Sequence, residues 1–175
     1  MRRQLTASLI FVWLCTAAFA AFQSAQWKEY EYPADGFAIS APAKPVSQDQ
    51  QTSTVIGQLQ SHTYMIELGG DAGVVVSVTD FGKGPNVNAK EMLQGAKEGS
   101  LKSTNSKLVS EKEILLDGNP GLEFDFEASA YHGHARYYIV RGRLLALMSI
   151  APATQPIAPV TGKIFDSLRL LKAAG

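Results

Sequence analysis

Hydrophobic and polar residues alternate through much of the chain, and this pattern predicts short β-strands. Successive side chains of a strand point to opposite faces of a sheet, so alternation indicates a strand with one buried face. The matching runs fall into two groups, which are 27–32, 36–41, 52–59, 62–68 and 74–81, then 107–116, 121–128, 134–141 and 144–150. Short connections join the second group, which predicts an antiparallel meander.

A helical pattern separates the two groups of strands. Asn88 is a suitable N-cap, and Glu91 three residues later completes a capping box. The residues predicted to pack on the sheet recur at helical spacing, and they are Ala89, Met92, Leu93 and Ala96. The residues predicted to face water are Lys90, Lys97, Glu98 and Lys102.

Gly95 and Gly99 lie one turn apart inside this predicted helix. Each glycine costs about 1 kcal/mol relative to alanine in a helix interior. We therefore expect the helix to approach the sheet closely at these two positions.

The C-terminal region predicts a proline-rich loop, a short helix and a final strand. Val160 and Ile164 share one side of that helix, and Leu168 and Leu170 are spaced as in a strand. Two groups of strands, with helices between and after them, predict an α+β fold with an antiparallel sheet flanked by helices.

The N-terminus has the pattern of a secretory signal peptide. Arg2 and Arg3 precede an apolar run over residues 9–22, interrupted only by Thr16, and small residues stand at positions 18 and 20 within it. This run covers 14 positions, whereas a transmembrane helix needs about 20. We predict a cleaved signal peptide at 1–20, an entry segment at 21–35 and a single domain at 36–171. The alternative is an uncleaved membrane anchor.

Charge and cysteine content narrow the function classes further. The chain has 16 Lys and Arg against 16 Asp and Glu. Cleavage after Ala20 would remove two arginines and Cys15, which is the only cysteine, so the mature chain would form no disulfide of its own. Its mixed-sign surface argues against nucleic acid and against anionic lipid as partners. We expect an exported protein without stable membrane insertion, periplasmic if the host has two membranes and otherwise secreted.

Several segments together are typical of one known superfamily. They are GFAISAPAKP at 36–45, the glycine-containing helix at 88–104, LDGNPGLEF at 116–124, YYIVRGRLLAL at 137–147 and IFDSLRL at 164–170. In this order they resemble small exported bacterial proteins of the PsbP-like superfamily. That fold is an antiparallel sheet with helices on both faces, shared with photosystem II extrinsic proteins and a Ran-binding import factor.

The resemblance covers about residues 27–171 and rests on turn and core positions. It implies a fold, and members of the superfamily bind other proteins or have no known role. The chain departs from the pattern at Ala41, where a bulky residue is usual, and at Leu145, where an aromatic one is usual. No functional residue is carried over by the resemblance.

His132 and His134 form the most specific candidate for chemistry. Two histidines separated by one residue on a strand project to the same face and can share a divalent metal ion. Asp125 or Glu127 on the preceding strand would supply a third ligand if the register places it opposite. The alternative is that both histidines lie at an exposed hairpin tip without binding metal.

Three acids, Glu123, Asp125 and Glu127, alternate with phenylalanines on the same run. They form either a carboxylate stripe for a cation or for acid–base work, or the solvated face of a half-buried strand. On the second interpretation, Arg136 or Tyr138 of the next strand would pair with them.

Motifs of known enzyme families are missing from the sequence. It contains no G-x-S-x-G and no H-E-x-x-H, and residues 81–85 lack the spacing of a phosphate-binding loop. We therefore predict no catalytic residue and no bound cofactor. The leading hypothesis is a non-enzymatic binding or accessory protein with another envelope protein as partner. The alternatives are a metal or small-ligand carrier using His132 and His134, and a hydrolase whose site is assembled from scattered residues.

Overall fold

The computed structural model describes residues 27–54, 57–81 and 88–172. The predicted signal peptide and the loop at 82–85 lie outside these residues. The described elements are β1 (Lys28–Tyr32), β2 (Phe37–Ala41), β3 (Val46–Thr54), β4 (Gly57–Gly69), β5 (Ala72–Asp80), α1 (Ala89–Ser103), β6 (Lys107–Leu116), β7 (Asn119–Glu127), β8 (Tyr131–Val140), β9 (Arg143–Pro152), α2 (Val160–Asp166) and β10 (Arg169–Leu170).

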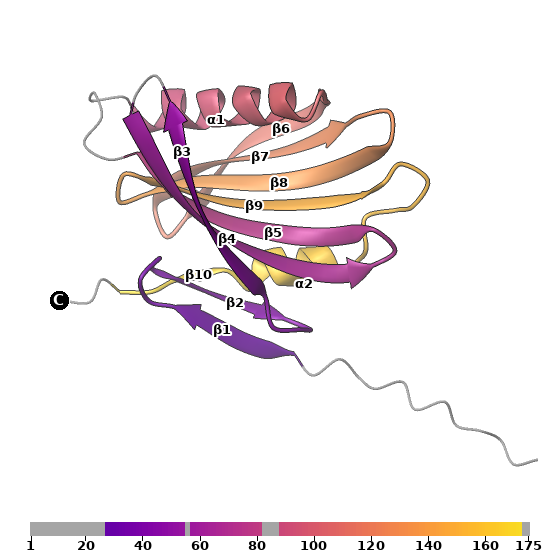
Figure 1. The fold of residues 1–175 in the computed structure, drawn as a ribbon, viewed down its shortest axis with the longest axis horizontal. Coiled ribbons are helices and arrows are strands. Elements are labelled where there is room, and N and C mark those ends of the chain that lie inside the picture. Colours follow the sequence, from indigo (N-terminus) through magenta and orange to yellow (C-terminus); the bar gives the residue numbers. More distant parts are fainter. Residues whose placement is uncertain (1–26, 55–56, 82–87, 173–175) are drawn as a thin grey trace, which may run out of the picture.

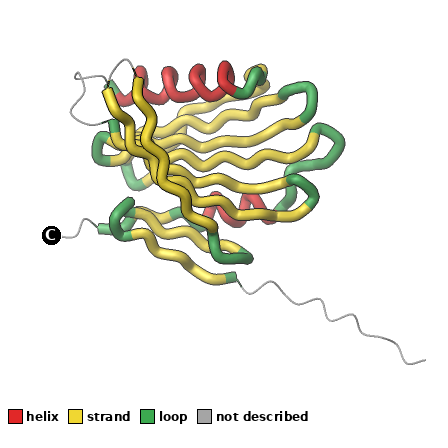
Figure 2. The backbone as a smooth tube through the Cα atoms, viewed as in Figure 1, coloured by secondary structure: helices red, strands yellow, loops and turns green. Residues whose placement is uncertain are grey.

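Seven strands form one large antiparallel sheet in the order β3-β4-β5-β9-β8-β7-β6 (Figure 1). Strands β6 to β9 are neighbours in chain order, which confirms the predicted meander. The first and last strands form a separate small sheet in the order β1-β2-β10. The described chain is thus richer in sheet than an α+β assignment suggests, although helices flank the sheet as predicted (Figure 2).

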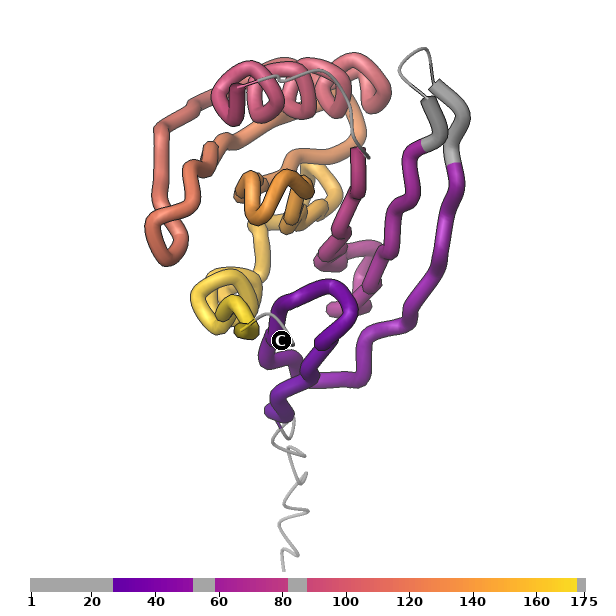
Figure 3. The backbone as a smooth tube through the Cα atoms, turned by 90° about the vertical axis from the view of Figure 1, so that its left-hand side faces the viewer, coloured from indigo at the N-terminus to yellow at the C-terminus, as the bar shows by residue number. Residues whose placement is uncertain are grey.

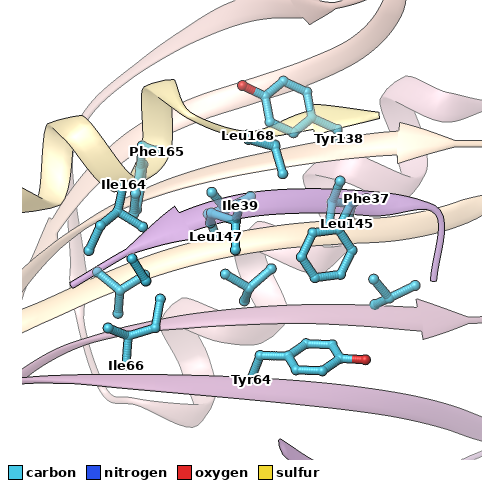
Figure 4. Packing of buried hydrophobic residues seen from close by; sticks show 14 of the residues in the cluster. Phe37, Ile39, Tyr64, Ile66, Tyr138, Leu145, Leu147, Ile164, Phe165 and Leu168 are labelled. Carbon is cyan, nitrogen blue, oxygen red and sulfur yellow. The ribbon is translucent and has the colours of Figure 1, made fainter. Parts of the chain in front are cut away.

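The large sheet is covered differently on its two faces (Figure 3). The small sheet and α2 pack on one face, here called the inner face, through a buried cluster that includes Phe37, Ile39, Tyr64, Leu147 and Phe165 (Figure 4). Helix α1 packs on the opposite face, here called the α1 face, mainly over β7 and β8. Its cluster includes Leu93, Phe124, Phe126 and Tyr137.

The prediction of a single strand over 52–59 is wrong, because one strand ends and another begins within that run. Strand β3 ends at Thr54 and β4 begins at Gly57, and the two pair along their length from Val46↔Met65 to Thr54↔Gly57. Residues 46–51 are all exposed, so no hydrophobic alternation marks them as a strand. The sequence between Thr54 and Gly57 also keeps a β-rich composition and contains no strong turn signal, so it marks no boundary between the two strands.

Helix α1 confirms the predicted cap but corrects one surface residue. The Asn88 side chain accepts a hydrogen bond from the backbone N–H of Glu91 at 2.9 Å. Lys97, expected to face water, has a side chain only 8% exposed and forms an ion pair with Glu111 of β6. The acid lies on a strand that follows in sequence, so the helical pattern alone did not reveal the burial of this lysine.

The expectation of close helix–sheet contact at Gly95 and Gly99 is also wrong. Both residues are exposed, and a Cβ atom built at either position has no atom within 4 Å apart from those of its own helix turn and chain neighbours. The close approaches occur instead on the sheet, where Phe126 packs over Gly133 and Tyr138 packs over Gly121.

Gly95→Ala and Gly99→Ala should therefore each stabilise the protein by about 0.5–1 kcal/mol, because alanine restricts the unfolded chain and meets open space in the helix. Chemical denaturation followed by circular dichroism measures the effect. Gly133→Ala is the matched control, since its Cβ would lie 2.2 Å from Phe126 Cζ and 2.4 Å from the Ser149 carbonyl oxygen. It should cost about 1–3 kcal/mol, and a neutral result there would contradict this account of glycine placement.

Candidate functional site

Two of the predicted site residues, His134 and Asp125, belong to a polar network on the inner face of the sheet. The register places Asp125 opposite His134 and Glu123 opposite Arg136. His134 Nδ1 lies 2.7 Å from Asp125 Oδ1, and Arg136 Nε donates to Glu123 Oε2 at 2.7 Å. Lys112 of β6 adds an ion pair to Glu123 at 2.8 Å. The expected Glu123–Arg136 cross-strand pair is thus present.

Helix α2 closes one side of this network. Asp166 accepts a hydrogen bond from Arg136 at 2.7 Å. The Phe165 ring lies 5.5 Å from the His134 ring and 5.6 Å from the Arg136 guanidinium carbon. Phe165 is itself buried, so the helix fixes the basic side chains over the strands. The network joins three strands and a helix rather than opening into a cavity.

The electrostatics of the network favour fixed ion pairs. Burial alone would raise the pKa of Glu123, but hydrogen bonds from Lys112 and Arg136 and the charge of Arg136 hold that pKa below its ordinary value of 4.5. Burial opposes the shift at Asp125 too, yet hydrogen bonds from Ser110 and His134 lower the pKa of this carboxyl. A general acid needs a raised pKa to carry a proton near neutral pH. These two carboxylates are instead held ionised.

The second histidine has a different neighbour. His132 lies on the same face as His134, opposite Glu127 in the register. Its Nε2 lies 2.7 Å from the carbonyl oxygen of Gln155, so the ring holds the loop before α2. Neither histidine is at a hairpin tip, since both lie within β8. The described residues contain no group of three or more His, Cys, Asp or Glu arranged to hold a metal ion.

A second polar cluster was not anticipated from the sequence. The Asp35 side chain is 2% exposed and lies 2.7 Å from His62 Nδ1. It also accepts a hydrogen bond from the Tyr64 hydroxyl. Arg143 donates to the Asp35 backbone carbonyl at 3.0 Å. Burial, and then the Asp35 carboxylate, raise the pKa of Tyr64. Asp35 and His62 lie 27 residues apart in the chain, so no local pattern in the sequence links them.

In a catalytic triad a buried carboxylate orients a histidine ring through one ring nitrogen and leaves the other nitrogen to act on a nucleophile. Asp35 holds Nδ1 of His62 in the same way. The nearest hydroxyls in the strand register do not complete it. Ser61 precedes His62 and therefore points to the opposite face, where Thr79 Oγ1 donates to its Oγ at 3.1 Å. These contacts hold the turn at Asp35 against β4 and β9.

The α1 face carries a third feature beyond the helix. Val46, Met65, Val75 and Met148 are successive register partners across β3, β4, β5 and β9, so they form one apolar row. Val46 and Met65 are 59% and 37% exposed. No described helix lies over β3, β4 and β5 on this side (Figure 3). We call this region the open face; its exposed or half-buried side chains are Val46, Gln48, Gln50, Leu59, Ser61, Thr63, Met65, Val75, Ser77, Thr79, Met148 and Ile150.

Comparisons with known proteins establish the fold only. No family model matches the chain, and no curated protein matches it in sequence. The solution structure of cyanobacterial PsbP (CyanoP) from Synechocystis sp. PCC 6803 is similar, with a TM-score of 0.58 and 11% sequence identity over 89% of this chain and 98% of that one. The chain therefore has a PsbP-like fold. Neither helix in its described part is long and apolar enough to cross a bilayer.

The divalent-metal hypothesis remains a prediction, and zinc titration by calorimetry tests it. If His132 and His134 bind the ion, His132→Ala combined with His134→Ala should weaken zinc binding at least tenfold, because a site that loses two of its ligands loses its coordination. His62→Ala is the control, since His62 lies in the separate cluster at Asp35. Equal zinc affinity in wild type and in the double variant would contradict the hypothesis.

Glu123→Gln should destabilise the protein by about 1–2 kcal/mol at pH 7, because it removes the charge that accepts from Arg136 and Lys112. The pKa of Glu123 is lowered on folding, so its contribution is present above about pH 4.5 and is lost as the pH falls below that value. The stability difference between wild type and variant should therefore shrink in acid. Urea denaturation at several pH values measures it.

The matched control is Glu127→Gln, which removes an exposed acid from the same strand. Its effect should stay below about 0.5 kcal/mol at every pH. Identical pH profiles for wild type and Glu123→Gln would show that the ion pairs of Glu123 add nothing to stability.

Proposed function

We propose that this chain is an exported, non-enzymatic accessory protein that binds another protein of the cell envelope through its open face. The N-terminal pattern of Arg2, Arg3 and an apolar run supports export, to the periplasm if the host has two membranes. The balanced charge supports a protein partner over nucleic acid. The polar networks at His134 and Asp35 support the fold under this proposal, and neither supplies a reaction centre.

The observation that carries the proposal is the absence of charge on the open face. Within 46–51, 59–66, 74–79 and 144–150, the described strand residues that point to the α1 face include no Lys, Arg, Asp or Glu. On β4, the nearest charged residue that points to the same side as the open face is Glu67, at the end of the strand. Depletion of charged residues, with exposed methionine, is typical of the core of protein interfaces.

The same composition defines the partner's chemistry. A charged partner side chain pressed onto this face would lose its hydration without gaining an opposite charge, which is costly. We therefore infer an uncharged partner surface that is apolar and carries hydrogen-bonding groups for Ser77 and Thr63. Helix α1 packs beside that surface, mainly over β7 and β8 (Figure 3).

The fold likeness is compatible with this proposal and adds little to it. PsbP-like folds specify an architecture, and the 11% identity to the cyanobacterial structure conveys no site residue. The argument for a binding role therefore rests on the surface of this chain.

A photo-crosslinking residue placed at Ser77 or at Thr63 should capture the same partner in intact cells of the source organism, because both positions lie on the open face. The matched position is Glu98, which is exposed on α1 next to Lys97, the residue that binds Glu111 of the far edge strand β6. Ser77→Lys should reduce capture from Thr63 at least tenfold, since it introduces an unpaired charge into the contact. Ser103→Lys, on the exposed end of α1, should leave capture unchanged.

The test compares capture between positions, because capture at a single position would not show which surface binds the partner. Equal capture from Glu98 and from Ser77, or capture that survives Ser77→Lys, would contradict binding through the open face.

A further inference from the structure

The two edges of the large sheet differ in how they are protected from pairing with another strand. Edge strands present unpaired N–H and C=O groups, and natural proteins guard them with charges and bulges. Strand β6 has both, because its register with β7 shifts between Leu108 and Ser110 and its centre is Glu111, Lys112 and Glu113. Strand β3 has neither a bulge nor a cluster of charges.

Strand β3 is regular along its length. All nine of its residues pair with β4 without a register shift. Asp49 is the only charged residue in 46–51, and every side chain in this range is exposed. Its outer edge has no neighbour in the described sheet (Figure 1). It therefore offers a straight, accessible row of backbone donors and acceptors to an incoming strand.

The charge pattern favours a second copy of this chain as that strand. When two identical strands pair antiparallel about a twofold axis, the residue on the axis faces its own copy. An axis at any of the three central residues of β6 would place like charges directly opposite each other, which is destabilising. An axis at Ser110 would fall on the bulge.

An axis through Gln48 of β3 creates no such conflict. Gln48 faces its own copy, Ser47 faces Asp49 of the second copy, and Val46 faces Gln50. The two amides can hydrogen-bond each other, and the serine hydroxyl can donate to the carboxylate. By contrast, an axis one residue further along would place Asp49 against itself.

We propose that two copies of this chain pair antiparallel through β3, with Gln48 on the twofold axis, so that their large sheets become continuous. The pairing joins the outer backbone edge of β3 to its copy, whereas the partner in the proposed function lies on the side chains of the open face; Val46, Gln48 and Gln50 belong to both regions. The contact spans few residues, so we expect a weak dimer with a dissociation constant of about 1–100 µM.

Analytical ultracentrifugation of the purified full chain across that concentration range tests the pairing. Wild type should shift from monomer to dimer. Gln48→Lys and Gln48→Glu should each weaken the dimer at least tenfold, because like charges meet on the axis. An equimolar mixture of the two variants should restore dimerisation, since opposite charges then face each other. Leu115→Lys, at a residue that is 74% exposed on the guarded edge, is the control and should dimerise as wild type does.

Restoration by mixing is the decisive result, because a general loss of stability in the variants would not be repaired by it. Wild type that stays monomeric throughout, or variants whose mixture stays monomeric, would overturn the proposal. The assay contains no other protein, so a monomeric result would not contradict the partner proposed at the open face. Failure of the crosslinking experiment would likewise not contradict the dimer.

Discussion

The buried carboxylate of Asp35 holds in place the small sheet that covers the inner face of the large sheet. Strand β10 pairs with β2 through Leu170↔Phe37, so the last strand completes a small sheet begun by the first two. Arg169 binds Glu29 and Glu31 of β1 across that sheet. Asp35, in the turn between β1 and β2, ties the assembly to β4. The hydrophobic cluster beneath, with Phe37 and Ile39 fully buried, depends on this cover remaining in place.

The unequal cover of the two faces follows from this arrangement. The small sheet and α2 both pack on the inner face and cover it. On the α1 face a single 15-residue helix packs mainly on β7 and β8, and the ion pairs of Lys90 and Lys97 to β6 hold it toward that edge. The strands on the other side of β9 thereby keep half-buried apolar and hydroxyl side chains on a surface that no described helix covers. This is the physical origin of the open face, on which the proposed binding role rests.

Local signals in the sequence were sufficient for the helix cap, the meander and the alternation of acids with phenylalanines, because each depends on residues within one element or one hairpin. The buried Lys97 was missed since its partner Glu111 lies on a later strand. The Asp35–His62 contact was missed for the same reason, whereas the end of β3 at Thr54 was missed because no change in composition marks it. At the candidate site, the sequence left open whether the register would bring Asp125 or Glu127 opposite the histidines, and the structure pairs Asp125 with His134 and Glu127 with His132. The contact of His132 with the Gln155 carbonyl oxygen could not be read from spacing.

The distribution of charge connects these features. On the inner face of β7, beside β6 and β8, acids are paired with Arg136, Lys112 or His134, so the energetic penalty of desolvating them is offset. On β6 the charges at 111–113 protect an edge. On the open face and along most of β3 charge is nearly absent, although both are accessible to water. A surface without charge is poorly solvated relative to its surroundings, and its free energy falls when another uncharged surface or strand covers it. The same physical reasoning therefore supports a partner at the face and a second copy at the edge.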